Sequence, residues 1–176
     1  MDEAGFAELV QLACHDLRTP LAAVNGFSKT ILRAGELGEL RFVELIDEAA
    51  SQMAVLIEQL GLAARIAAGN YEPHRIEANT LELAAASGFP ASGKGVAVET
   101  DAATVARALA ALATATVRFG GEGTAPRWTV AGRELLLEPA AEPATMNRDV
   151  GAVVALAVLD ILGSVEHEGG TLRVFL

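Results

Sequence analysis

The sequence predicts an α+β protein in two parts, a long helical hairpin over residues 1–70 and a small α/β sandwich over residues 71–176. Two observations lead to this fold class. In the first part apolar residues recur at spacings of three and four over two long stretches, and in the second part short helical and strand-like segments alternate. The chain has 176 residues, 52% of them hydrophobic, which suffices for two small domains with a core in each.

Two long helices make up the first part. Residues 3–34 fit one helix, a break with two glycines follows at residues 34–39, and a second helix runs from about 40 to 68 and stops before Gly69. The apolar stripes of the two helices are Phe6, Leu9, Ala13, Leu17, Leu21, Val24, Phe27 and Ile31, and then Phe42, Ile46, Ala50, Met53, Ile57, Leu60, Ala64 and Ala67. One hairpin alone leaves its stripe in water, so we expect two copies to form a homodimeric four-helix bundle about a twofold axis.

The second part begins after Pro73, where the pattern changes to short segments. Asn79-Thr-Leu-Glu82 fits a capping box at the start of a helix, and Asp101 fits the N-cap of another. The elements expected in chain order are a helix at 79–87, a strand at 96–100, a helix at 101–119, strands at 127–130 and 134–137, a helix at 147–162, and strands at 164–166 and 172–176. We expect the helices to cover one face of a mixed sheet.

Composition and charge exclude several classes of function. The formal net charge of -10 argues against binding to a phosphate backbone, so nucleic acid is not an expected partner. No run of about eighteen apolar residues is free of charges, so we expect no membrane span. The acidic start Met1-Asp2-Glu3 is unlike a secretory signal, and Cys14 is the single cysteine, which fits a reducing cytoplasm.

Residues 14–20, Cys-His-Asp-Leu-Arg-Thr-Pro, place reactive side chains within the first helix. Asp16 is adjacent to His15, and Arg18 and Thr19 lie three and four positions further on, which puts both beside His15 on the helix surface. An imidazole is a nucleophile near neutral pH and can carry a phosphoryl group on nitrogen. A neighbouring carboxylate can orient the ring or take its proton, and a hydroxyl one turn away can position a water or a phosphoryl oxygen.

The seven residues from His15 to Leu21, His-Asp-Leu-Arg-Thr-Pro-Leu, resemble the H-box of two-component sensor histidine kinases. In that family the motif lies on the first helix of the dimerisation and histidine-phosphotransfer hairpin. The resemblance implies that His15 is the phosphoacceptor, Asp16 its acid–base and orienting partner, and Thr19 the residue used in hydrolysing a phosphorylated receiver. Arg18 is a candidate for stabilising the phosphoryl oxygens. The alternative, which has equal weight, is that Arg18 is an ordinary solvated side chain on the surface.

The order of elements from residue 75 to 176 is similar to the ATP-binding domain that follows the hairpin in this family, but the nucleotide motifs are missing. Ala111 and Ala115 stand where the family has asparagines, and an alanine has no oxygen with which to bind Mg²⁺. Residues 138–141 are Glu-Pro-Ala-Ala in place of Asp-x-Gly-x-Gly, and residues 139–150 contain no glycine. The resemblance therefore implies a degenerate ATP-binding domain, and we expect no cofactor bound by this chain.

An intact phosphoacceptor beside a lost ATP site is typical of the dimeric histidine phosphotransferases of bacterial phosphorelays, which the chain resembles in this respect. We therefore expect His15 to take a phosphoryl group from one receiver domain, such as that of an upstream hybrid kinase, and to pass it to a response-regulator receiver. Mg²⁺ would come with the receiver. The alternatives are an active histidine kinase with diverged ATP motifs and a pseudokinase scaffold that carries no phosphate. We expect a free-standing chain, and a piece of a longer kinase is the alternative.

His74 and His167 are weaker candidates for a site. His74 follows a proline, and we expect it to be exposed. His167 stands between Glu166 and Glu168 near a strand end, but alternation along a strand points it to the face opposite both, so we expect no metal site there.

Overall fold

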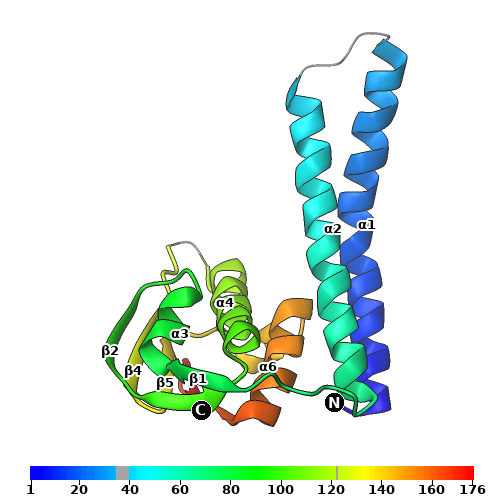
Figure 1. The fold of residues 1–176 in the computed structure, drawn as a ribbon. Helices are drawn as coiled ribbons and strands as arrows, with labels where there is room; N and C mark the ends of the chain where they lie inside the picture. The colour runs from blue at the N-terminus through cyan, green and yellow to red at the C-terminus, as the bar shows by residue number, and fades with distance from the viewer. Residues whose placement is uncertain (35–39, 122) are drawn as a thin grey trace. The chain divides into compact units, whose positions relative to one another are not determined.

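The computed structural model describes residues 1–34, 40–121 and 123–176, and these form two compact units, Met1–Ala67 and Ala68–Leu176 (Figure 1). The first unit is an antiparallel hairpin of α1 (Glu3–Ala34) and α2 (Leu40–Ala67). The second unit is a small α/β structure. The predicted hairpin followed by an α/β sandwich is confirmed. A break is predicted at residues 34–39, and residues 35–39 lie outside the described residues.

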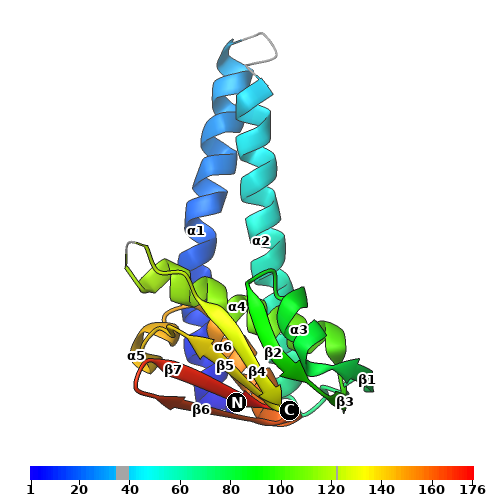
Figure 2. The same cartoon turned by 90° about the vertical axis from the view of Figure 1, so that its left-hand side faces the viewer.

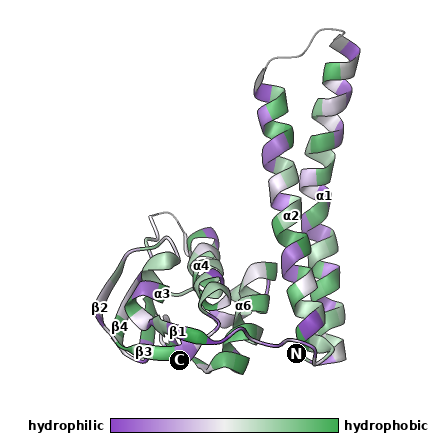
Figure 3. Ribbon diagram, viewed as in Figure 1, coloured by the Kyte–Doolittle hydropathy of each residue, from purple (hydrophilic) through white to green (hydrophobic). Residues whose placement is uncertain are grey.

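Helix packing in the first unit follows the stripe predicted on α1, but on α2 the prediction is wrong by one position: the buried residues are Ala49, Ala63 and Ile66, each one place before the predicted Ala50, Ala64 and Ala67. Leu9, Ala13 and Ala63 are buried, and the rings of Phe27 and Phe42 stack with their centroids 5.6 Å apart. Hydrophobic and hydrophilic positions alternate along both helices (Figure 3). This is the pattern of amphipathic helices that bury one side.

A second line of apolar side chains on the hairpin stays exposed. Val43, Ala50, Ile57 and Ala64 recur every seven residues along α2, so they share one face of that helix. Val43 is 47% exposed and Ile57 is 61% exposed, and Leu21 on α1 is 51% exposed. One neighbouring helix covers only one side of an amphipathic helix, so the predicted α1 stripe divides into a buried part and a part open to solvent, and the predicted α2 stripe lies beside the buried positions of its helix.

The second unit contains the remaining elements. In chain order they are β1 (Ile76–Asn79), α3 (Thr80–Ala86), β2 (Ala91–Gly95), β3 (Ala97–Thr100), α4 (Ala102–Phe119), β4 (Arg127–Gly132), β5 (Glu134–Glu138), α5 (Pro143–Met146), α6 (Val150–Leu162), β6 (Ser164–Glu168) and β7 (Thr171–Phe175).

A five-stranded mixed sheet is the framework of this unit. Its strand order is β2-β4-β5-β7-β6, with β2 and β4 parallel and the other pairs antiparallel, and β1 and β3 form a separate antiparallel pair. Helices α4 and α6 lie on one side of the sheet (Figure 2), as predicted. The alternate side chains that face the helices form the core: Trp128, Val130, Leu135, Leu137, Leu172 and Val174.

Three elements, β1, β2 and α5, have no clear signal in the sequence pattern. Strand β2 reads Ala-Ser-Gly-Lys-Gly and has no β-branched or aromatic residue, so it is a strand only through its pairing with β4. The helix predicted at 147–162 begins at Val150, because Asp149 is its N-cap and α5 ends before it.

Thr80 joins three segments of the second unit. Its buried hydroxyl donates to the carbonyl oxygen of Gly132 at 2.6 Å and accepts from the N–H of Val96 at 3.0 Å. Its own N–H donates to the carbonyl of Val96 at 3.0 Å. Gly95 has no room for a side chain here, because a Cβ would lie 2.1 Å from Oδ1 of Asn79, the N-cap residue of α3. The start of α3 is therefore fixed against the β2–β3 link and the β4–β5 turn.

Helix α4 is long and apolar enough to match a membrane span, and within the described ranges it is the one such helix. Eight of its residues are buried, among them Leu109 and Leu112, and the helix packs against α6. The core helix of an α/β unit needs the same composition, so the apolar character of α4 follows from its place in the core.

Asp101 connects the segment that leads into the second unit to the start of α4. One carboxylate oxygen accepts from the N–H of Thr104 at 3.1 Å, and the other accepts from the hydroxyl of Tyr71 at 3.1 Å and from the N–H of His74 at 3.3 Å. Burial alone would raise the pKa of Asp101, but the hydrogen bonds from Thr104, Tyr71 and His74 outweigh it and hold that pKa below its ordinary value.

We predict that the second unit loses stability at low pH partly through Asp101. The folded-state pKa lies below the unfolded one of about 3.9, so the stabilising contribution is complete above the unfolded pKa and is lost as the pH falls through the folded-state pKa. The free energy of unfolding of the wild type should exceed that of Asp101→Asn near neutral pH, and the difference should shrink below about pH 5. Trp128 is the single tryptophan, so its fluorescence in urea follows this unit.

The matched control is Glu168→Gln, which removes an exposed carboxylate from β6 and should keep the wild-type pH dependence. A stability gap between the wild type and Asp101→Asn that stays constant from about pH 7 to about pH 3 would contradict the assignment.

Candidate functional site

Helix α1 places His15 and Asp16 side by side in the first unit. Nδ1 of His15 lies 3.1 Å from Oδ1 of Asp16. A carboxylate oxygen only accepts, so in the neutral ring Nδ1 carries the hydrogen and Nε2 keeps its lone pair. The side chain of His15 is 77% exposed and that of Asp16 is 29% exposed. The histidine is therefore open to a partner and oriented by the aspartate.

Arg18 and Thr19 are exposed one turn beyond His15, on the side that their spacing predicts. Among the residues that the structure describes, neither side chain forms an ion pair or a hydrogen bond. Pro20 follows them inside the helix, and it is buried and lacks the N–H that would bond the carbonyl of Asp16. The structure thus brings His15 and Asp16 together and leaves Arg18 and Thr19 free, and the roles assigned to these four residues stay predictions.

In the second unit, α4 presents small side chains at the two positions assigned to a lost nucleotide site. Ala115 is fully buried and Ala111 is half-buried, and neither has an oxygen to offer a ligand. The hydroxyl of Thr116 donates to the carbonyl of Leu112 at 3.0 Å and accepts from the N–H of Ala141 at 3.2 Å. This hydroxyl therefore joins α4 to the segment between β5 and α6.

Asp149 occupies the N-terminus of α6. Its side chain is 9% exposed, Oδ1 accepts from the N–H of Ala152 at 3.0 Å, and Oδ2 pairs with Nη1 of Arg118 at 2.6 Å. The N-terminus of a helix carries partial positive charge and attracts anions such as phosphate. Here a carboxylate of the chain itself takes that position, and the guanidinium of Arg118 is paired with it.

The segment between β5 and α6 is held by further hydrogen bonds. The N–H of Ala140 donates to the carbonyl of Gly170 at 2.7 Å, and Nε2 of His167 lies 2.9 Å from the carbonyl oxygen of Ala141. Met146, in the short helix α5, is fully buried. These contacts fix the connection that leads from the sheet to Asp149.

Part of this arrangement can be predicted from the sequence. An aspartate before an apolar helix indicates an N-cap, so the position of Asp149 has a local signal. Its pairing with Arg118, 31 positions away, has none. His167 is half-buried between the exposed Glu166 and Glu168, as strand alternation predicts. Within the described ranges no group of three His, Cys, Asp or Glu side chains could hold a metal ion.

Comparison with known families and structures bears on both units. Residues 7–69 match the family model described as the His Kinase A (phospho-acceptor) domain. Among solved structures, the chain is similar to the histidine kinase AdeS of Acinetobacter baumannii, with a TM-score of 0.70 and 14% sequence identity, over 92% of this chain and 97% of that chain. No curated protein matches the chain.

Residues 7–69 thus match the His Kinase A (phospho-acceptor) domain family, and the chain as a whole has a fold similar to that of a histidine kinase, with a second unit that resembles a histidine-kinase ATP-binding domain. The resemblance predicted from the H-box and the order of elements is confirmed at this level. At 14% identity the likeness to AdeS shows the fold alone.

We predict that Asp149→Ala destabilises the second unit. The change removes the N-cap bond of α6 and the partner of Arg118, and it should lower the free energy of unfolding by about 1–2 kcal/mol. Urea unfolding followed by the fluorescence of Trp128 measures the change.

Asp160→Ala is the matched control, because it removes a carboxylate from the last turn of the same helix. A negative charge there opposes the helix dipole, so its loss should leave the stability equal or slightly higher. Equal destabilisation by the two variants would show that Asp149 has no special part in holding α6.

Proposed function

We propose that the protein is a histidine phosphotransferase of a two-component phosphorelay. On this proposal His15 takes a phosphoryl group from the aspartyl phosphate of one receiver domain and passes it to the aspartate of another, and the chain uses no ATP of its own. The phospho-acceptor domain over residues 7–69 and the exposed His15–Asp16 pair support the acceptor role. The distinction from a kinase depends on the second unit.

The observation that carries the proposal is the carboxylate of Asp149 at the N-terminus of α6. A nucleotide would bring several negative charges to a kinase-like unit, and this carboxylate would repel them while engaging the guanidinium of Arg118. On α4, Ala111 and Ala115 supply no oxygen for Mg²⁺. The residues present therefore do not fit ATP with Mg²⁺, and no step of the mechanism uses it.

The chemistry proposed for His15 follows from its hydrogen bond to Asp16. Nε2 attacks the phosphorus in line, an N–P bond forms, and the P–O bond to the receiver's aspartate breaks, so that this aspartate leaves as a carboxylate. Asp16 keeps the proton on Nδ1 and balances the positive charge that develops on the ring. The reverse steps load a second receiver. Placement of His15 on a helix favours this route, because such transfers depend mostly on positioning.

The partner is expected to complete the site. In this proposal the receiver brings its own Mg²⁺, which neutralises charge on the group in transit. Arg18 contacts the phosphoryl oxygens as a charged donor, and Thr19 positions a water when a phosphorylated receiver is hydrolysed. Both side chains are exposed beside His15 and are available for these contacts.

We propose further that the protein acts as a homodimer through the hairpin. His Kinase A domains form homodimers and act with response regulators. In this chain the exposed line of Val43, Ala50, Ile57 and Ala64 supports the same arrangement. A repeat of seven along a helix suits packing against the helices of a second copy in a bundle.

An ATP-dependent histidine kinase is the second candidate. It is favoured by the likeness to a solved histidine kinase, which extends over 92% of this chain and so includes the second unit. It requires ATP to bind despite Asp149 and the two alanines of α4. The two functions differ in the source of the phosphoryl group, which is ATP for the kinase and a receiver for the phosphotransferase.

We predict that His15 is labelled from phosphorylated receivers and not from ATP. The full chain is incubated either with radiolabelled ATP and Mg²⁺, or with a panel of receiver domains charged with radiolabelled acetyl phosphate and then freed of excess reagent. Acid-labile label should appear on the chain only in the second reaction, and His15→Gln should abolish it.

The matched control is His74→Gln, which changes an exposed histidine of the second unit and should leave the labelling unchanged. Acid-labile label from ATP that requires His15 would overturn the proposal in favour of the kinase. Absence of label from every receiver encoded in the same genome would favour a scaffold that carries no phosphate.

A further inference from the structure

Helix α6 is unusually apolar for a helix that reaches the surface. It carries one charged residue, Asp160, in a length of 13 residues. One side of the helix packs against α4, whereas Leu156 and Ala157 are half-buried and Asp160 is exposed on another side. In the described parts of the chain, Asp160 forms no ion pair and no side-chain hydrogen bond. An unpaired charge thus lies at the edge of an apolar surface.

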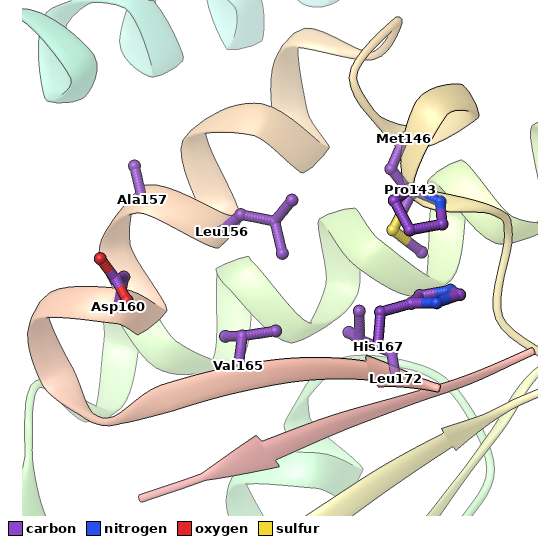
Figure 4. A pocket seen from close by; sticks show the side chains of 8 residues that line it. All are labelled: Pro143, Met146, Leu156, Ala157, Asp160, Val165, His167 and Leu172. Carbon is purple, nitrogen blue, oxygen red and sulfur yellow. The ribbon is translucent and has the colours of Figure 1, made fainter. Parts of the chain in front are cut away.

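A cavity of about 350 Å³ that is broadly open to solvent lies along this side of α6, between the helix, α5 and β6 (Figure 4). Apolar side chains make up most of its wall, and they include Pro143, Met146, Leu156, Val165 and Leu172. The polar lining residues are Asp160 and His167, which lie at opposite ends of the cavity in Figure 4. Pockets for small molecules have volumes of about 300–1,000 Å³ and walls of this kind, with a few polar groups that orient the ligand.

Both polar groups of the cavity are hydrogen-bond acceptors. The carbonyl of Ala141 only accepts, so Nε2 of His167 carries the hydrogen, and in the neutral ring Nδ1 keeps a lone pair. The carboxylate of Asp160 accepts as well. A ligand that pairs with these acceptors donates hydrogen bonds, and one that balances the charge of Asp160 is a cation. The apolar wall in between suits a hydrocarbon body.

We propose that this cavity binds a small amphipathic organic cation, a primary ammonium compound with an apolar body. The ammonium group pairs with Asp160, and the body packs against Leu156 and Val165. The site uses neither the His15 site nor the pair of Arg118 and Asp149, so it is independent of the phosphotransfer proposal. It would give the second unit a ligand of its own, different in charge from a nucleotide.

Titration of the full chain with phenethylammonium chloride, followed by protein-observed NMR, tests the site. We expect saturable shifts at residues of α6 and β6. Asp160→Asn should weaken binding about two- to fivefold, which is the loss expected for an ion pair at an exposed carboxylate. Ala157→Leu extends a side chain into the cavity and should abolish the shifts. Asp160 is exposed, so its substitution tests the charge without disturbing the core, and circular dichroism checks that both variants are folded.

Three controls distinguish a charge-selective site from nonspecific binding to an apolar surface. Phenethyl alcohol, the neutral analogue, should bind more weakly than the amine, and 3-phenylpropionate should not bind. Glu168→Gln changes a carboxylate on the opposite face of β6 and should bind the amine as the wild type does. The proposal is overturned if the wild type shows no saturable shift, if amine, alcohol and carboxylate bind alike, or if Asp160→Asn keeps the full affinity.

Discussion

The carboxylate of Asp149 is the constraint on which the second unit depends. It caps α6 through the N–H of Ala152, and it pairs with Arg118 at the end of α4, so one group ties together the two helices that cover the sheet. A helix N-terminus needs an anion or an acceptor, and this one is supplied from within the chain. The unit can therefore keep its helices in place without a bound phosphate, and a negatively charged ligand meets repulsion at the same point.

The two units of the chain thus differ in how exposed their main polar side chains are to solvent. In the first unit His15 is 77% exposed and has its ring oriented by Asp16, which prepares Nε2 for an incoming group. In the second unit the carboxylate of Asp149 is 9% exposed and is paired with the guanidinium of Arg118. On the proposed function, an exposed acceptor histidine in a chain whose kinase-like unit does not accept a nucleotide takes its phosphoryl group from a donor outside the chain. This contrast is the physical basis for preferring relay over autophosphorylation.

Much of the fold could be predicted because its signals are local. Helical spacing predicts the long helices, and the residues around His15 lie within one or two turns of the same helix, so their neighbourhood is already contained in the sequence. The features that could not be predicted depend on long-range encounters. Strand β2 exists through pairing with β4, Asp149 meets Arg118 from 31 positions away, and Asp160 and His167 line one cavity only once α6 and β6 are in place.

Isothermal titration calorimetry of the full chain with ATP and Mg²⁺ tests the central claim most directly, because it asks about the nucleotide site without requiring any partner. We predict no saturable heat up to about 1 mM nucleotide, a concentration at which a micromolar site would be filled. We also predict no change in the unfolding of the unit that contains Trp128, since a ligand that binds the folded state would stabilise it. Saturable micromolar binding would contradict the claim that this unit does not accept a nucleotide, and its loss in Arg118→Ala would place the nucleotide at the pair of Asp149 and Arg118.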